Sequence, residues 1–65
     1  MKKILYKNIV VDSNVMVGKP VIDGTRIPID LIIELMSQGI STNEILEDYP
    51  NLKKEDILTV LEYLD

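Results

Sequence analysis

The stretch GKPVIDGTRIPIDLI, residues 18–32, contains the constraints that decide how this chain folds. Asp23-Gly24 lies between two short runs that favour extended structure, and such a pair is typical of the two-residue turn of a β-hairpin. The pattern predicts that Ile22 pairs with Thr25 across the turn and that Val21 faces Arg26.

The prolines of this stretch mark the limits of the hairpin. Pro20 has no backbone N–H, so its arm is expected at the edge of a sheet. Ile27 precedes Pro28 and is restricted to extended geometry, whereas Pro28 suits the start of a helix because its missing donor costs little there. We therefore expect the chain to change from strand to helix near residue 28.

The residues before this stretch indicate short strands. ILYKNIVVD, residues 4–12, is rich in isoleucine and valine with a polar break at Lys7-Asn8, which indicates one or two strands. DSNVMVG, residues 12–18, is predicted to form a turn, because Asp, Ser and Asn side chains hydrogen-bond to nearby backbone. Residues 1–28 are therefore expected to form a small β-unit that includes the hairpin.

Three helices are expected to follow, and their predicted limits are residues 29–38, 42–49 and 54–64. Gly39 can adopt the left-handed conformation that ends a helix. Ser41 and Glu44 have the spacing of a capping box at the start of the second helix, which must end near Pro50. Lys53 occupies the N-cap of the third helix but cannot accept the capping hydrogen bond, which weakens that start by about 1 kcal/mol.

The third helix is expected to bury an aliphatic stripe that consists of Ile57, Leu58, Val60, Leu61 and Leu64. Two short helices joined by YPNL, residues 49–52, after a first helix form a three-helix helix-turn-helix arrangement. The expected fold class is mainly α (α+β), with one domain over residues 1–65. In this domain the β-unit (residues 1–28) precedes a three-helix bundle (residues 29–65).

The small size of the chain predicts a homodimer. A core of 65 residues rarely supplies more than about 3–5 kcal/mol of net stability, and there is no cysteine for disulfides. The first helix is apolar over more than one helical stripe, so its candidate dimer-interface residues are Leu31, Ile32 and Leu35. Alternatively, the N-terminal strands cover this face.

Charge divides the chain near residue 28. Residues 1–28 contain five basic and two acidic side chains, whereas residues 29–65 contain two basic and nine acidic ones. This pattern fits a bipolar molecule whose ends meet different partners, or simply a solvated acidic surface. The net charge of −4 argues against a general nucleic-acid binder. No apolar run approaches the roughly 20 residues of a membrane span, so we expect a soluble cytoplasmic protein.

The sequence contains no clear motif for catalysis or for cofactor binding. Gly18-Lys19 lacks the other residues of a phosphate-binding loop. Glu44, Glu47 and Asp48 share a helical face, as ligands of a hard cation would, but a solvated acidic face is the simpler interpretation. Without cysteine or histidine, only lysines and carboxylates remain as catalytic bases. We therefore expect no enzyme activity, no cofactor, no metal and no small-molecule substrate.

The sequence resembles the domain-of-unknown-function family four-three-three in three places. These are GKPVI (residues 18–22), GTRIP (residues 24–28), and Tyr49-Pro50 followed by Leu52 and Glu55-Asp56-Ile57. The resemblance extends from Ile9 to Leu64. This chain departs from the family at Val17, where a small residue is usual, and at Lys53, where threonine is usual.

The resemblance implies a homeodomain-like helical bundle behind the β-unit. It also implies a function, because that family resembles VapB-type antitoxins and is often paired with a PIN-like ribonuclease toxin. The implied function is therefore an antitoxin-like protein that binds and neutralises such a toxin.

Arg26 and Lys19 are the candidate partner-binding residues. Arg26 follows a rigid turn, from which its guanidinium can form a bidentate contact with a carboxylate or a phosphate. The metal-binding acids of a PIN-like nuclease would offer such carboxylates. The alternative, which the sequence favours, is that Arg26 pairs internally with Asp23, Asp30 or Glu34 and fixes the hairpin onto the first helix.

Binding to operator DNA as a transcriptional regulator is an alternative function. The third helix of a helix-turn-helix enters the major groove, so the candidate DNA-binding residues are Lys53, Lys54 and Thr59. Glu55 and Asp56 stand directly beside the two lysines and reduce their attraction for phosphates. A protein-interaction module without DNA contact is the third interpretation.

Overall fold

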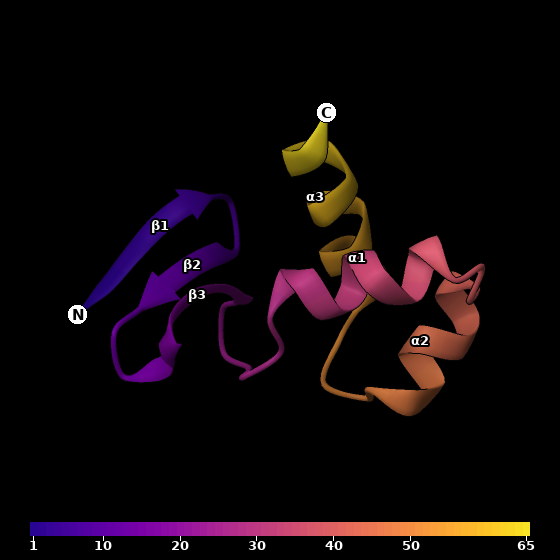
Figure 1. Cartoon of the computed structure of the whole chain (residues 1–65), viewed down its shortest axis with the longest axis horizontal. Helices are drawn as coiled ribbons and strands as arrows, with labels where there is room; N and C mark the ends of the chain where they lie inside the picture. The colour runs from indigo at the N-terminus through magenta and orange to yellow at the C-terminus, as the bar shows by residue number, and fades with distance from the viewer.

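The computed structural model of the chain describes residues 1–65 except the Met16 side chain, and it contains three strands followed by three helices (Figure 1). The strands are β1 (Lys2–Tyr6), β2 (Ile9–Asp12) and β3 (Val15–Ile22). The helices are α1 (Ile29–Ser37), α2 (Thr42–Asp48) and α3 (Lys54–Leu64). The three predicted helices are confirmed, with limits that differ from the expected ones by one residue at most.

The sheet has the order β1-β2-β3, and both pairs of neighbouring strands are antiparallel. Lys7-Asn8 connects β1 to β2, and Lys7 has a φ of 48°, in the left-handed region. Ser13-Asn14 connects β2 to β3, where the Asn14 N–H donates to Asp12 Oδ1 at 2.9 Å. The polar breaks of the N-terminal segment are therefore the turns of the sheet.

The two-residue hairpin turn predicted at Asp23-Gly24, with Ile22 opposite Thr25 and Val21 opposite Arg26, is wrong. The Thr25 N–H donates to the Ile22 carbonyl at 3.0 Å, which forms a four-residue turn. Of its two central residues only Gly24 has a positive φ, 81°. That is the pattern of a type II turn, whereas the type I′ turn of a hairpin needs a positive φ at both positions. The chain returns beside the end of β3 two residues later than predicted. Val21 therefore forms an antiparallel bridge with Pro28 instead of facing Arg26, and the Ile22 N–H donates to the Ile27 carbonyl at 3.1 Å.

The expected fold class, mainly α (α+β) with a homeodomain-like helix-turn-helix bundle behind a small β-unit with a hairpin, is also wrong, because the sheet is a larger part of the fold than expected. A three-stranded antiparallel sheet precedes the helices, so the architecture is α+β. Helix α1 packs against β3, α2 and α3, and it lies between the sheet and α2 in Figure 1. One buried cluster draws on both parts of the chain: Ile9, Ile22, Ile29, Ile32, Ile45, Leu52, Ile57 and Val60. The sheet is thus part of the core.

Helix α3 is attached to the β1–β2 turn at two places. Near its start, the buried Asp56 carboxylate accepts from the Lys53 backbone N–H at 2.9 Å and from the side-chain amide of Asn8. Near its end, Glu62 Oε1 accepts from the Tyr6 hydroxyl at 2.9 Å and from Lys7 Nζ at 2.7 Å. The Lys7 hydrogen bond lowers the pKa of Glu62, and the same contact raises the pKa of Lys7.

Asp56→Ala is expected to destabilise the fold by about 1–3 kcal/mol, because it removes a helix-capping acceptor and leaves the Asn8 amide without its partner. Urea denaturation followed by circular dichroism measures the change in the free energy of unfolding. Glu55→Ala, at the exposed neighbouring position, is the matched control and should change it by less than about 0.5 kcal/mol. Equal effects of the two substitutions would contradict this role of Asp56.

Val17 lies in a bulge of β3, where Val11 is opposite Pro20 but Asp12 is already opposite Val15. The φ of Val17 is 54°, and its side chain is almost fully exposed. A left-handed conformation costs an L-residue with a Cβ about 1–2 kcal/mol, and the β-branched valine is especially unsuited to it. The departure from the small residue of the resembled family therefore falls at a strained position.

Val17→Gly is expected to stabilise the fold by about 1 kcal/mol, because glycine adopts this φ without steric cost. For a domain of this size, that change corresponds to a rise in Tm of about 4–8 °C. Val15→Gly, at a paired strand position without positive φ, is the control and should lower the Tm. A lower Tm in Val17→Gly would show that the valine is not strained.

Candidate protein-interaction site around Arg26

Arg26 lies in a loop that is closed by its own hydrogen bonds. Thr25 Oγ1 donates to the Ile22 carbonyl at 2.8 Å and accepts from the Ile27 N–H at 3.1 Å. The Ile22 N–H in turn donates to the Ile27 carbonyl at 3.1 Å. The backbone is therefore fixed on both sides of Arg26, which is presented from a rigid base.

This loop forms one wall of an open groove of about 630 Å³. The connection between α2 and α3 forms the other wall, and the lining residues are Gly24, Thr25, Arg26, Ile27, Asp48, Tyr49, Pro50 and Asn51. The GTRIP and YPNL segments, which carry the family resemblance, therefore face each other across the groove although they are far apart in sequence. The sequence motifs identified these segments, but their proximity required the structure.

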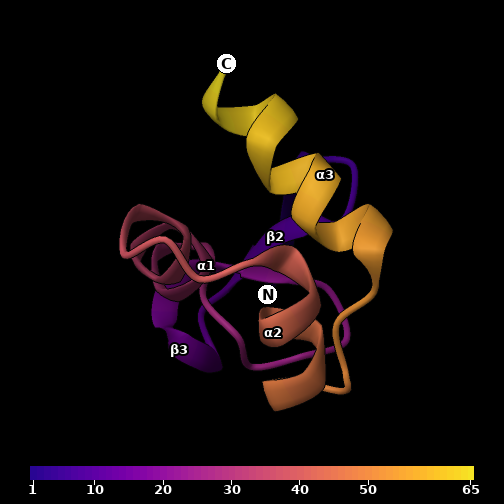
Figure 2. The same ribbon diagram turned by 90° about the vertical axis from the view of Figure 1, so that its right-hand side faces the viewer.

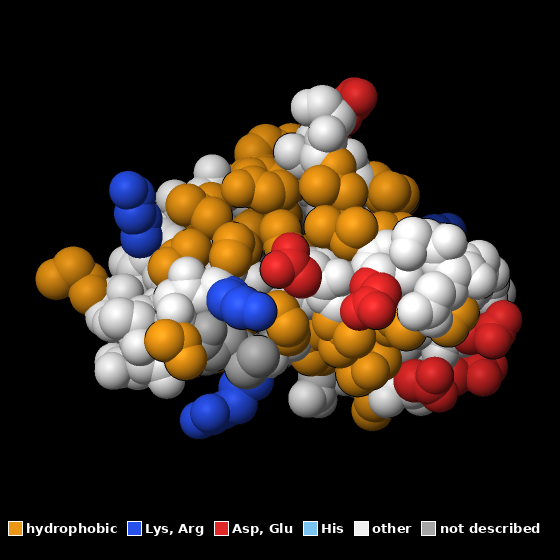
Figure 3. Space-filling view, in the orientation of Figure 1, with side chains coloured by type: hydrophobic (Ala, Val, Ile, Leu, Met, Phe, Trp, Pro, Cys, Tyr) orange, Lys and Arg blue, Asp and Glu red, His pale blue; other side chains and the backbone are white. Residues whose placement is uncertain are grey.

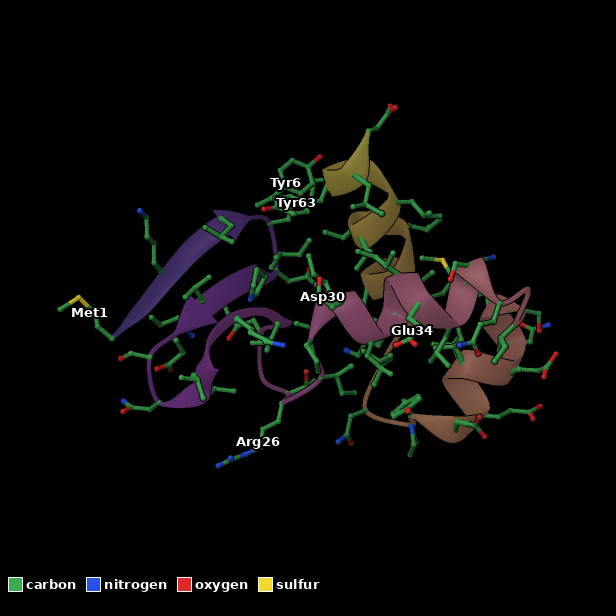
Figure 4. All side chains as sticks on the ribbon, viewed as in Figure 1. Met1, Tyr6, Arg26, Asp30, Glu34 and Tyr63 are labelled. Atoms are coloured by element: carbon green, nitrogen blue, oxygen red, sulfur yellow. The ribbon has the colours of Figure 1, made fainter. Side chains whose placement is uncertain are left out.

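The Arg26 side chain points away from the α1 residues Asp30 and Glu34 (Figure 4). Arg26 is exposed and forms no salt bridge with any side chain that the structure describes. Asp23, the third expected partner, instead pairs with Lys2 Nζ at 3.0 Å. The favoured prediction of an internal ion pair is therefore wrong, and the guanidinium is available to a partner.

The other candidate partner-binding residue, Lys19, is exposed on β3 but does not line the groove. It therefore shares the basic end of the molecule with Arg26 without sharing its site. Figure 3 shows this division of charge, with basic side chains mainly over the sheet and acidic side chains mainly toward α2.

Two residues that were predicted to contact a partner, one a second subunit and the other DNA, are buried. Ile32 is 0% exposed and belongs to the core, so it cannot contact a second subunit, whereas Leu31 and Leu35 are partly exposed. Thr59 is only 7% exposed and its hydroxyl donates to the Glu55 carbonyl at 2.8 Å, so it cannot read DNA. The assignments of Ile32 to a dimer interface and of Thr59 to DNA contact are therefore wrong.

The predicted buried stripe of α3 is narrower than expected. Ile57 and Val60 are buried, but Leu58, Leu61 and Leu64 are about half exposed. The sequence pattern does not distinguish the buried residues from the half-exposed leucines, because both groups have helical spacing. Which of them is buried depends on where α1 and α2 pack against α3.

The described residues were also searched for a metal site and for a membrane-spanning helix. Glu44, Glu47 and Asp48 are exposed on α2, and the described side chains contain no group of three or more potential metal ligands. Among the described residues, none of the helices has the length and apolar character needed to cross a membrane.

The chain was compared with known proteins. Over 29 residues it is 62% identical to an uncharacterized protein of Archaeoglobus fulgidus, and the aligned part covers 45% of this chain and 81% of that protein. No solved structure matches the chain. The family model described as "Protein of unknown function (DUF433)" matches residues 9–64. Because this match spans most of its length, the chain belongs to the DUF433 family.

Proposed function

We propose that this chain is an antitoxin-like protein that binds and neutralises a PIN-like ribonuclease toxin in the cytoplasm. The observation that carries the proposal is the exposed Arg26 guanidinium, unpaired among the described side chains, on a loop closed by hydrogen bonds. Because the backbone on both sides of Arg26 is already fixed, binding needs to order only the Arg26 side chain and not the loop that carries it.

The groove has one basic and one acidic lining residue, Arg26 and Asp48, and its Arg26 wall suits an acidic partner surface. A cluster of metal-binding carboxylates, as in a PIN-like nuclease site, would accept bidentate hydrogen bonds from Arg26. Tyr49 and Pro50 on the opposite wall supply apolar contact beside that charge. The chain would act by occupying the nuclease site and not by catalysis.

The alternative of operator binding now has less support. Of its three candidate residues only Lys53 and Lys54 are exposed, and Glu55 is exposed beside them. A net charge of −4 further weakens the phosphate attraction that dominates affinity for DNA.

Arg26→Ala is expected to weaken binding to a PIN-like nuclease encoded in the adjacent reading frame by about 2–5 kcal/mol, as when one partner of a buried charge pair is removed. The free energy of unfolding should change by less than about 0.5 kcal/mol, because Arg26 is an exposed residue in the free protein. Calorimetric titration and urea denaturation of the same variant measure the two quantities.

Arg26→Lys should recover only part of the affinity, since lysine retains the charge but lacks the planar fork of donors. Lys3→Ala, which removes another exposed cation from the sheet, is the matched control and should bind as the native chain does. Unchanged affinity in Arg26→Ala would remove Arg26 from the interface. Tight binding to upstream DNA at physiological salt, with no binding to the nuclease, would favour the regulator instead.

A further inference from the structure

A second surface, on α3, is left uncovered by the fold. Lys54, Leu58, Leu61 and Asp65 follow one another at intervals of four, three and four residues, which places them in a single line along one helix face. The first three also line one groove of about 360 Å³ between α3 and the start of α2. Leu58 is 49% exposed and Leu61 48% exposed. We call this line of four residues the α3 stripe.

The two ends of the α3 stripe carry charges that oppose the dipole of their own helix. Lys54 is the first residue of α3, where the dipole favours an anion, and Asp65 caps its end, where the dipole favours a cation. The described residues give neither side chain a salt bridge within the chain. Both charges would suit an antiparallel neighbouring helix, whose negative end would lie near Lys54 and whose positive end would lie near Asp65.

We infer that α3 pairs in antiparallel orientation with α3 of a second copy of this chain, about a two-fold axis that passes between Leu58 and Leu61. The stripe is symmetric in sequence about this point, so Leu58 of each copy meets Leu61 of the other. The same axis brings Lys54 of each copy to Asp65 of the other. A surface that is complementary to itself in this way is what a two-fold dimer requires.

The shape of the molecule agrees with this arrangement. The C-terminal half of α3 projects beyond α1 and α2 in Figures 1 and 2. The groove begins beside the first residue of α3, Lys54, and extends along the helix to Leu61. An antiparallel pair would place the projecting half of each helix along the groove of the other copy, and both exposed leucines would be covered.

The flanking acids do not prevent this contact. Glu62 lies beside the stripe, but it is paired with Lys7 at 2.7 Å. Glu55 is exposed, where solvent and salt screen its charge. An 11-residue helix offers less than the roughly 800 Å² per partner of a standard stable interface, so the dimer is of the weak, reversible class.

Sedimentation of the whole chain from micromolar to millimolar concentration tests the inference. The native chain should show a reversible monomer–dimer equilibrium. Leu58→Gln and Leu61→Gln should each raise the dimer dissociation constant at least about tenfold, because each substitution occurs twice in the symmetric interface. Circular dichroism should show an unchanged monomer fold, since both side chains are half exposed in the monomer.

Exchange of the two charges gives a sharper test that cannot be confused with unfolding. Lys54→Glu and Asp65→Lys should each weaken association by about threefold or more, because each places like charges opposite one another at both ends. The double variant should return to within about twofold of the native value. All these changes agree with the dipole of α3, so they are expected to maintain or strengthen the helix.

Leu31→Gln, on the partly exposed face of α1, is the matched control and should leave the dimer unchanged. A monomer that persists at millimolar concentration would overturn the inference. A dimer weakened by Leu31→Gln but not by Leu58→Gln would also overturn it and assign the interface to α1. The measurement uses this chain alone, so its result is independent of the proposed toxin.

Discussion

The strand-to-helix transition and the candidate site both depend on two hydrogen bonds of the Thr25 hydroxyl. It donates to the Ile22 carbonyl and accepts from the Ile27 N–H, so it spans the turn from β3 toward α1. In this position it fixes the direction in which α1 leaves the sheet. It also holds the backbone around Arg26, whose side chain extends from a rigid loop and has no salt bridge with any side chain that the structure describes.

The opposite wall of the groove depends on a separate set of constraints. Pro50 prevents α2 from continuing, because it has no backbone N–H. The Leu52 N–H donates to the Tyr49 carbonyl at 2.9 Å and so closes the turn between α2 and α3. Leu52 is buried in the core, and Asp56 fixes the start of α3 to the β1–β2 turn. The groove thus lies between two anchored segments, and a partner could bind it without ordering a flexible loop.

Local signals explain why the helices could be predicted from the sequence. The Ser41 hydroxyl accepts from the Glu44 N–H at 3.2 Å, as the capping pattern indicated, and Gly39 has the expected positive φ. The sheet was harder to predict, because a polar Lys7-Asn8 pair is a weaker hairpin signal than Asp23-Gly24. Arg26 could be identified as a candidate from its residue type and its position after the turn. The sequence could not show that it lacks an ion pair with the described side chains, because this depends on the direction in which the loop leaves the sheet. The half-exposed leucines of α3 likewise depended on helix packing, which periodicity does not specify.

The structure contains two separate surfaces, the Arg26 groove and the α3 stripe, for which we propose an acidic partner and a second copy of the chain, respectively. The central claim is that Arg26 contacts carboxylates of a nuclease site. A double-mutant cycle between Arg26 and each metal-binding acid of a PIN-like nuclease encoded in the adjacent reading frame would measure this contact most directly. We predict a coupling energy of about 1.5 kcal/mol or more for at least one pair, as found for close charges across an interface. Coupling energies near zero for every pair would contradict the account.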